Sequence, residues 1–380
     1  MASAPVMGRL VARSLENHLP LNVHFDVTYR CNERCVHCYL EHDDRGELTT
    51  VEIRRVLAEL AEAGTLFLTF SGGEIFLRSD FFELLACARK LRFDITLKTN
   101  ALLVNAERAA ELRRLGVRRM QISLYSADAA VHDAITRVPG SFVRTLQALE
   151  FCKAQGLQVK ISCPLMKQNI GDYRGVQGLA AALDVPYLMD PTITPMLDGA
   201  RGPLTMRLDV GELLPVLRDP ALNPPRVAAP EGSAAPAPAH AYENIPCSAG
   251  HNSVYISPYG DVYPCVQMPL PTGNLRQKSF AEIWNGSAQM QRLRAVRESD
   301  LAICSICSIR RFCQRCPGLA YMEEGDLAGP SGRACELAEA AAALAGVSNP
   351  VSALRARGRL PHAQKSNLSQ LVQIAARSTS

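Results

Sequence analysis

The chain has 380 residues, of which 47% are hydrophobic and 21% charged, a composition typical of a globular protein with a sizeable core. Its formal net charge of +4 is small for this length and no basic stripe is present, so we expect no nucleic-acid partner. No apolar run reaches the roughly 18–20 residues of a membrane span, and residues 1–20 lack the apolar stretch of a secretory signal. We therefore expect a cytoplasmic protein that does not contact a membrane.

Residues 21–190 alternate short apolar runs with amphipathic stretches. The predicted strands are Leu21–Thr28, Leu66–Phe70, Asp94–Thr99, Arg119–Leu124, Gln158–Cys163 and Pro186–Asp190. The predicted helices are Thr50–Ala63, Ser79–Leu91, Asn105–Leu115, Ser141–Gln155 and Asp172–Leu183. Strand–helix repeats imply parallel strands with right-handed crossovers. We therefore expect an α/β fold, a partial (β/α)6 TIM-like barrel, with its site at the carboxyl ends of the strands.

The order of these features predicts five segments. They are an N-terminal segment 1–20, a core barrel 21–218, a Pro/Ala-rich linker 219–246, a cysteine-rich module 247–340 and a C-terminal tail 341–380. An Ala-rich helical stretch over Glu336–Ala345 leads into the tail, which is polar and basic.

Thirteen cysteines are many for a protein of a reducing compartment, where clustered cysteines more often bind metal than form disulfides. Ten of them fall in two groups, Cys31–Cys38 and Cys247–Cys335. The other three, Cys87, Cys152 and Cys163, lie among apolar residues, and we expect them to be small buried hydrophobic side chains.

The first group, Cys31, Cys35 and Cys38, directly follows the first predicted strand. Three thiolates leave the fourth iron of a [4Fe–4S] cluster without a protein ligand, whereas structural clusters and structural zinc sites usually have four. The incomplete set therefore indicates a ligand from outside the protein. A Cys3His zinc site that uses His37 is the alternative.

The C-x3-C-x2-C segment, with Ser71, Gly72, Gly73 and Glu74 after the next strand, resembles the radical S-adenosylmethionine (SAM) superfamily over about residues 20–190. The resemblance implies that the cysteines hold a [4Fe–4S] cluster whose free iron chelates the amino and carboxylate groups of SAM. It also implies that the Ser71–Glu74 turn contacts the methionine amino group. The two glycines would let the backbone approach this ligand, and Glu74 would accept from the ammonium group. The family usually has Pro where this chain has Ile75.

The same resemblance suggests further contacts with SAM. His37 stands where the family places an aromatic residue near the adenine, Ser123 resembles a ribose contact, and Thr99 and Asn100 end the neighbouring strand. The implied chemistry is reductive cleavage of SAM to a 5′-deoxyadenosyl radical that abstracts a substrate hydrogen. It implies an electron donor such as flavodoxin or ferredoxin. No residue beyond the cluster ligands is assigned a catalytic role.

The second cysteine group contains two C-x2-C pairs, which alone would also fit a zinc ribbon. With Gly260 and the flanking cysteines, the pattern is similar to the SPASM extension of radical SAM enzymes, which implies two auxiliary [4Fe–4S] clusters. One would use Cys304, Cys307, Cys313 and Cys335, and the other Cys247, Cys265 and Cys316. The last gap of the four-cysteine run is two residues, where the family usually has three. The second set lacks a fourth thiolate, so either His240 or Glu243 completes it or one iron is open.

SPASM-type radical SAM proteins mostly modify ribosomally made peptides, so the resemblance predicts an enzyme that crosslinks or oxidises such a peptide. Only about 20 residues precede the first strand, so a separate leader-peptide-binding protein or the barrel surface would have to bind the precursor. The alternatives are a small-molecule or porphyrin-modifying oxidoreductase, a sulfatase-type formylglycine maturase, and a non-catalytic iron–sulfur or zinc scaffold.

Overall fold

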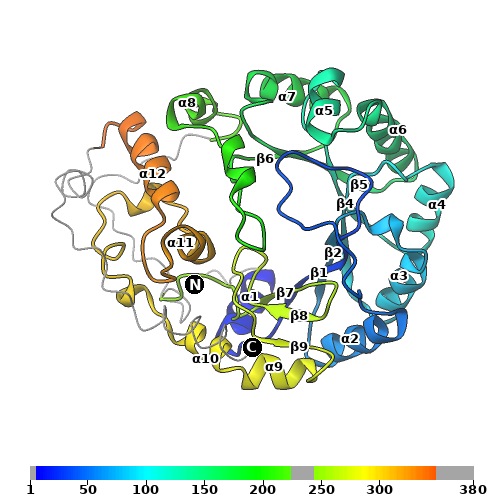
Figure 1. Ribbon diagram of the computed structural model, residues 1–380, viewed down its shortest axis with the longest axis horizontal. Helices are drawn as coiled ribbons and strands as arrows, with labels where there is room; N and C mark the ends of the chain where they lie inside the picture. Colours follow the sequence, from blue (N-terminus) through cyan, green and yellow to red (C-terminus); the bar gives the residue numbers. More distant parts are fainter. Residues whose placement is uncertain (1–5, 224–243, 348–380) are drawn as a thin grey trace.

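The computed structural model describes residues 6–223 and 244–347, which are built around one curved nine-stranded sheet (Figure 1). The strand order is β6-β5-β4-β3-β2-β1-β7-β8-β9. The first six strands are β1 (Asn22–Thr28), β2 (Phe67–Gly72), β3 (Asp94–Thr99), β4 (Arg119–Ser123), β5 (Gln158–Pro164) and β6 (Tyr187–Asp190). Each of them pairs in parallel with the next. This arrangement confirms the expected α/β fold with a partial TIM-like barrel.

Helices cover the outer face of these six strands (Figure 1). They are α2 (Thr50–Glu62), α3 (Phe81–Lys90), α4 (Ala106–Arg114), α5 (Ala129–Thr136), α6 (Ser141–Ala154) and α7 (Tyr173–Ala182). Helix α2 begins at a capping box. The Glu52 N–H donates to the Thr49 side chain, and the Thr49 N–H donates to the Glu52 side chain. The predicted helices match these elements, except that α5 was not expected.

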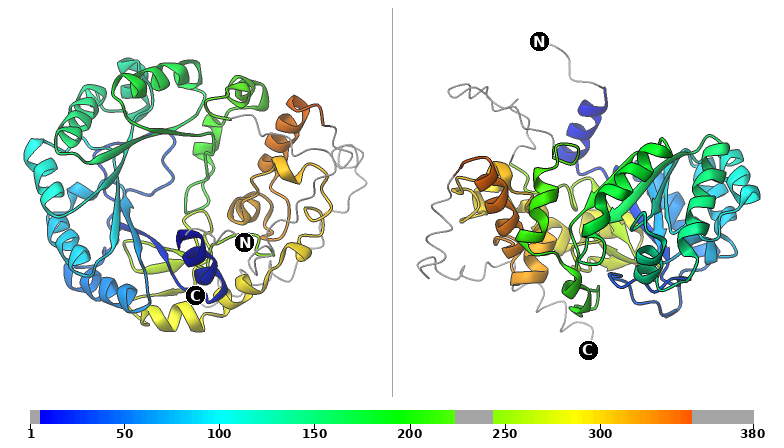
Figure 2. Two further views of the ribbon diagram at one scale, coloured as in Figure 1. Left: turned by 180° about the vertical axis from the view of Figure 1, so that it is seen from behind. Right: turned by 90° about the horizontal axis from the view of Figure 1, so that it is seen from above.

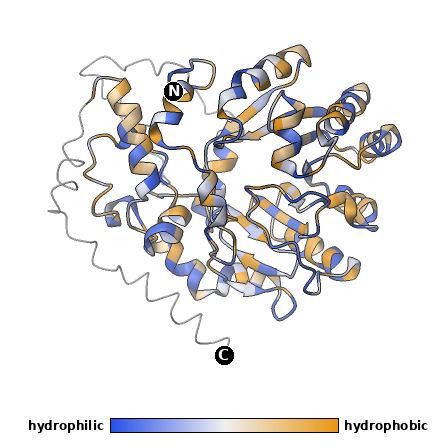
Figure 3. Ribbon diagram, turned by 45° about the horizontal axis from the view of Figure 1, so that its top comes forward, coloured by the Kyte–Doolittle hydropathy of each residue, from blue (hydrophilic) through white to orange (hydrophobic). Residues whose placement is uncertain are grey.

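Residues along the strands alternate between two environments, as the side-chain period of two requires (Figure 3). On β1, Val23, Phe25 and Val27 face the helices and are buried in the main hydrophobic core. The residues between them, such as His24 and Asp26, face the inside of the barrel. The core therefore lies between sheet and helices, and the barrel interior carries polar side chains.

Strand β7 (Ser253–Ile256) extends the barrel sheet, although it belongs to the cysteine-rich part of the sequence. It pairs in parallel with β1, with Phe25 opposite Ile256. Two short antiparallel strands follow, β8 (Asp261–Tyr263) and β9 (Gly273–Asn274). The sheet is thus continuous across the expected domain boundary at residue 247. The sequence did not predict that β7 would pair with β1. The boundary itself stays a prediction.

The other helices are α1 (Val6–Glu16), α8 (Val210–Arg218), α9 (Phe280–Gly286), α10 (Ala288–Ala295), α11 (Pro317–Glu324) and α12 (Gly332–Leu344). Short 3₁₀ turns occur at Ile75–Leu77, Ile170–Asp172, Gly202–Met206, Glu298–Asp300 and Arg310–Phe312. After β6 the chain runs between the open side of the sheet and the cysteine-rich part (Figures 1 and 2). There the Leu197 N–H donates to the Tyr39 carbonyl, at 3.0 Å.

Within the two described ranges, no helix combines the length and the apolar character needed to cross a membrane. Most of the expected linker and tail lie outside the described residues.

Candidate active site

One cavity of about 300 Å³ opens at the carboxyl ends of the barrel strands. The loop after β1 contributes Cys31, Cys35 and Cys38 to its lining. Most of the other residues that the sequence suggested for SAM line the same cavity, namely His37, Ser71, Gly72, Gly73, Thr99, Asn100 and Ser123. The structure therefore brings together residues from four strand ends, as a parallel barrel requires. Glu74 is the one member of the predicted set that does not line the cavity.

The two glycines allow two pieces of backbone to pack closely. A Cβ on Gly72, whose φ is +132°, would lie 2.0 Å from the Thr28 carbonyl oxygen, and one on Gly73 would lie 2.3 Å from the Arg30 oxygen. Any other residue would therefore push the β2 turn away from the loop that carries Cys31. The sequence predicted these glycines for approach to a ligand, and the contacts observed here are with the end of β1.

Glu74 is completely buried, and its carboxylate accepts hydrogen bonds from protein groups. The Thr99 hydroxyl donates to both of its oxygens at 2.7 and 2.9 Å, and the Asn100 and Phe76 N–H groups donate at 2.9 and 3.1 Å. Burial raises the pKa of this carboxyl, and these donors oppose the rise. Glu74 thus joins the ends of β2 and β3. Its expected contact with SAM stays a prediction.

The three cysteines of the loop after β1 are largely buried, and Cys31 has donors that suit metal-bound sulfur. The Glu33 N–H donates to Cys31 Sγ at 3.4 Å, and the Asn100 side-chain amide donates to the same sulfur at 3.8 Å. Burial raises the pKa of the Cys31 thiol to about 12 and also raises those of Cys35 and Cys38. Metal binding releases such protons, since thiolate is the ligand form. Three thiols on one loop, with two N–H donors at Cys31, fit a cluster bound from one side.

His37 and Tyr125 form a second wall of the cavity. Their rings meet edge to face with centroids 5.0 Å apart, and the Tyr125 hydroxyl lies 3.7 Å from Cys35 Sγ. His37 Nδ1 is buried and has no hydrogen-bond partner among the described residues. Burial lowers the pKa of His37 to about 4, so the ring is neutral at pH 7. A neutral ring with an unused nitrogen fits the role expected beside an adenine. Tyr125 lies two residues after the end of β4.

The interior of the barrel also contains polar side chains that the sequence analysis did not identify as site residues. His24 Nε2 donates to Asp26 Oδ1 at 3.0 Å, and the Tyr255 hydroxyl of β7 donates to Asp26 Oδ2 at 2.8 Å. His24 and Lys98 both line the cavity. The alternation of polar and apolar residues along β1 and β3 could have predicted these side chains. Because the apolar residues face the helices, the polar residues between them must face the inside of the barrel.

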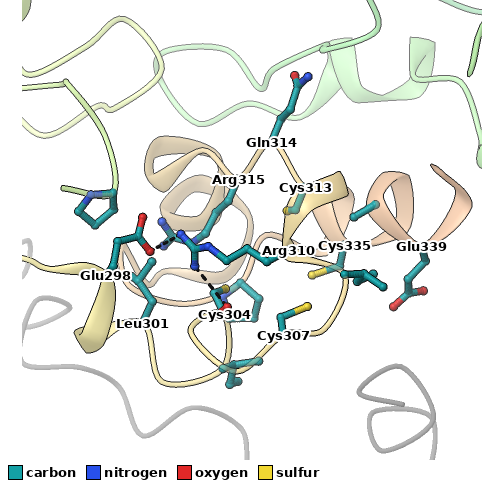
Figure 4. A pocket seen from close by; sticks show the side chains of 15 residues that line it. Glu298, Leu301, Cys304, Cys307, Arg310, Cys313, Gln314, Arg315, Cys335 and Glu339 are labelled. Carbon is teal, nitrogen blue, oxygen red and sulfur yellow. Dashed lines mark hydrogen bonds and ion pairs between the residues drawn. The ribbon is translucent and has the colours of Figure 1, made fainter. Parts of the chain in front are cut away.

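A second cavity of about 220 Å³ lies in the cysteine-rich part. Its lining includes four cysteines, Cys304, Cys307, Cys313 and Cys335, which face the same space from a loop, a turn and α12 (Figure 4). Arg310 borders this cavity, where it donates to the Cys304 carbonyl and forms an ion pair with Glu298. These are the four cysteines that the SPASM resemblance groups into one cluster, and a set of four thiols fits a fully ligated cluster.

The third set, Cys247, Cys265 and Cys316, is also brought together. Cys247 and Cys265 pack against the same small apolar cluster, and the charges of Cys247 and Cys316 add to burial in raising the pKa of Cys265 to about 11. The Cys316 thiol donates to Gln267 Oε1 at 3.5 Å. His240 and Glu243, the suggested fourth ligands, lie outside the described residues.

The geometry of these cysteines bears on the zinc alternatives. Across residues 6–223 and 244–347, no three His, Cys, Asp or Glu side chains are close enough to hold a single metal ion. The ligands of a four-iron cluster each bind a different iron atom, so they surround a cube instead of meeting at one point.

The chain matches two families. The model of the radical SAM superfamily covers residues 25–177, and SPASM, an iron–sulfur cluster-binding domain, covers residues 247–317. Mycofactocin maturase MftC of Mycobacterium ulcerans is 32% identical over 298 residues, which are 72% of this chain and 77% of that protein. The chain belongs to the radical SAM superfamily. Radical SAM enzymes with a SPASM domain bind SAM and [4Fe–4S] clusters, and this enzyme shares both cofactors.

Two further relatives are of interest. The AdoMet-dependent heme synthase of Methanosarcina barkeri is 28% identical over 81% of this radical SAM chain and 94% of its own. The SAM-bound crystal structure of Streptococcus suis SuiB superposes with a TM-score of 0.65 at 17% identity, over 87% of this chain and 81% of SuiB. SuiB has also been solved with its precursor peptide SuiA, at a TM-score of 0.61. At these identities the structures show a shared fold.

Proposed function

We propose that this radical SAM enzyme modifies a ribosomally made peptide by abstracting a hydrogen atom, forming a crosslink or an oxidised residue. The main support is the similarity to mycofactocin maturase, whose 32% identity extends over most of both chains. The fold shared with SuiB, which has been crystallised with a precursor peptide, agrees with this proposal. A separate leader-peptide-binding protein and a flavodoxin- or ferredoxin-type donor belong to the same proposal.

Within the first cavity we assign roles by position. Cys31, Cys35 and Cys38 would hold the cluster that, with SAM bound, supplies the 5′-deoxyadenosyl radical. The Ser71–Gly73 backbone would lie along the methionine part, and Glu74 would keep that turn in register with β3. His37, Tyr125 and Ser123, which line the same cavity, would contact the nucleoside. These roles rest on the shared cavity and on the hydrogen bonds around it.

The cysteine-rich part would hold two further clusters. Cys304, Cys307, Cys313 and Cys335 would supply all four ligands of one. Cys247, Cys265 and Cys316 would supply three ligands of the other. Gln267, which contacts Cys316, also lines the first cavity, so this three-cysteine set lies directly behind the active-site wall. A cluster there would be well placed to accept an electron from the substrate.

A porphyrin side chain is the second candidate substrate. It is favoured by the similarity to the heme synthase, which extends over 94% of that enzyme. It also agrees with a cavity wall that presents Lys98 and His24, since porphyrin side chains carry carboxylates.

The test is an anaerobic reaction of the reconstituted enzyme with SAM and dithionite. It is run with peptides encoded next to the gene in one arm and with iron-coproporphyrin III in the other. The proposal expects 5′-deoxyadenosine and a peptide that has lost two hydrogen atoms by mass spectrometry. Turnover of the porphyrin with unchanged peptides would overturn the peptide assignment. Absence of 5′-deoxyadenosine in both arms would contradict an active radical SAM enzyme.

A further inference from the structure

We propose that Lys98 binds a carboxylate group of the substrate inside the active-site cavity. This inference rests on the proposed function in one respect, namely that the cavity admits the substrate of the radical reaction. Lys98 lies on β3, one residue before Thr99, and lines the cavity together with His24 and Gln267.

Among residues 6–223 and 244–347, the charge of Lys98 has no counter-ion. Within the described residues its ammonium group forms no ion pair within 4.0 Å. Burial lowers the pKa of Lys98, and the charges of Asp26 and Cys265 only partly oppose this effect. A half-buried ammonium group without a partner costs free energy, and an anion bound from outside would offset that cost.

The nearest acid in the barrel is already engaged. Asp26 has no exposed surface, and its two oxygens accept from His24 Nε2 at 3.0 Å and from the Tyr255 hydroxyl at 2.8 Å. Tyr255 is held in turn by a 2.6 Å hydrogen bond with the Tyr29 hydroxyl. This network fixes Asp26 at a position from which it does not pair with Lys98. The cavity therefore keeps a cation available for a ligand.

The position of Lys98 favours the substrate over SAM as the source of that anion. The carboxylate of SAM is expected at the free iron, beside the loop of Cys31, Cys35 and Cys38. Lys98 instead lies close enough to Cys265, a member of the three-cysteine set, for the charge of that thiol to act on its pKa, and Val266 and Gln267 line the same cavity. A group bound there would lie between the radical source and the electron acceptor.

A carboxylate is also the anion that this wall fits best. Phosphate sites usually combine several backbone N–H groups, as at the start of a helix. The lining near Lys98 combines strand side chains with Val266 and Gln267 between β8 and β9, and Lys98 is the one lysine among the lining residues, which matches a single negative charge. An acidic peptide residue, a peptide C-terminus or a porphyrin propionate would each supply that group.

The experiment uses the anaerobically reconstituted holoenzyme saturated with SAM, with propionate as probe and propionamide as its neutral match. Binding is followed by the NMR relaxation of the methylene protons of each probe. The variants are Lys98→Met, Lys98→Arg and, as matched control, Lys160→Met, a half-buried lysine of β5 outside the cavity. Iron content and the affinity for SAM are measured on every variant.

We expect propionate, and not propionamide, to bind the wild type, Lys160→Met and Lys98→Arg, and to bind Lys98→Met about tenfold more weakly or worse. Equal binding of propionate by Lys98→Met would overturn the proposal. So would a tenfold loss of SAM affinity in Lys98→Met with propionate binding intact, because Lys98 would then serve SAM. A failed search for a peptide product would not alter propionate binding, so the two proposals fail separately.

Discussion

The Tyr255 hydroxyl donates a 2.8 Å hydrogen bond to Asp26 Oδ2 and so links β7 of the cysteine-rich part to a carboxylate inside the barrel. Because Asp26 has no exposed surface, this donor and His24 replace the water that the charged group would otherwise bind. The link ties the position of the His24 imidazole, on the cavity wall, to the packing of a strand more than 200 residues further along the chain.

Removing this hydroxyl should destabilise the fold. Tyr255→Phe leaves one oxygen of Asp26 without its donor, and the loss should be about 1–3 kcal/mol in the free energy of unfolding. Urea denaturation of the metal-free protein measures it. Tyr263→Phe, on β8, is the matched control and should change stability little. Equal effects of the two variants would count against the network.

Gly73→Ala should disrupt the active-site turn. The added Cβ would meet the Arg30 oxygen at 2.3 Å, so the end of β1 must move, at a cost of about 1–3 kcal/mol. Iron uptake at the Cys31 loop should fall in parallel. Gly171→Ala, where a Cβ meets nothing within 4 Å, should leave both quantities near the wild-type values. Normal stability and iron content in Gly73→Ala would contradict the packing described here.

Cys35→Ala should abolish formation of 5′-deoxyadenosine from SAM, because the radical-generating cluster would keep only two protein ligands. Cys87→Ala, which removes a half-buried cysteine outside the three sets, should keep full activity. Chromatographic detection of 5′-deoxyadenosine after reduction with dithionite distinguishes them. Retained cleavage in Cys35→Ala would remove this residue from the cluster.

Cys335→Ala should separate SAM cleavage from product formation. The wild type should carry about twelve iron atoms per chain, four for each of three clusters, and the variant about four fewer. Cleavage of SAM should continue, while product from the substrate should be lost. Iron analysis and product analysis on the same sample check both parts. Full product from this variant would refute an auxiliary redox role, and four irons with zinc would favour a ribbon.

The stability of the protein should fall in mildly acidic solution. Burial lowers the pKa of His132 to about 4, below its ordinary value of 6.5, and His132 Nδ1 accepts from the Tyr125 N–H. The unfolded chain therefore takes up a proton between pH 6.5 and 4 that the folded chain excludes, so stability is present above pH 6.5 and is lost as the pH falls. His132→Asn should reduce this pH dependence by about one proton. The free energy of unfolding is measured by urea denaturation at several pH values between 4 and 6.5. If it depended on pH equally in the wild type and in His132→Asn, the lowered pKa of His132 would be contradicted.

The sequence predicted the barrel well, because its strands and helices are marked by local patterns. Val23, Phe25 and Val27 alternate with polar residues, and Thr49 and Glu52 mark the start of α2. The spacing of Cys31, Cys35 and Cys38 likewise kept three cysteines together at the first cavity, whereas the set of Cys304, Cys307, Cys313 and Cys335 was implied by the resemblance to the SPASM extension. These features depend on short stretches of chain, which a single sequence records directly.

Other features depend on contacts between distant residues and left little local signal. Strand β7 has four residues, and its pairing with β1 joins positions more than 200 apart. The sequence motif predicts that Glu74 contacts a ligand. In the structure its carboxylate accepts hydrogen bonds from Thr99 and Asn100, which lie at the end of another strand. The alternation along β3 does put Lys98 on the inner face, but only the folded barrel shows that it has no counter-ion in the part of the chain that the structure describes.

The place of β1 between β2 and β7 also limits how the chain can be divided. A fragment that ends before residue 247 would lose β7 and leave the backbone groups of Asn22–Phe25 on one side without partners. Strand β1 would then become the open edge of the barrel sheet, where a second molecule could add. The isolated barrel should therefore self-associate, because the cysteine-rich part supplies the strand that covers this edge.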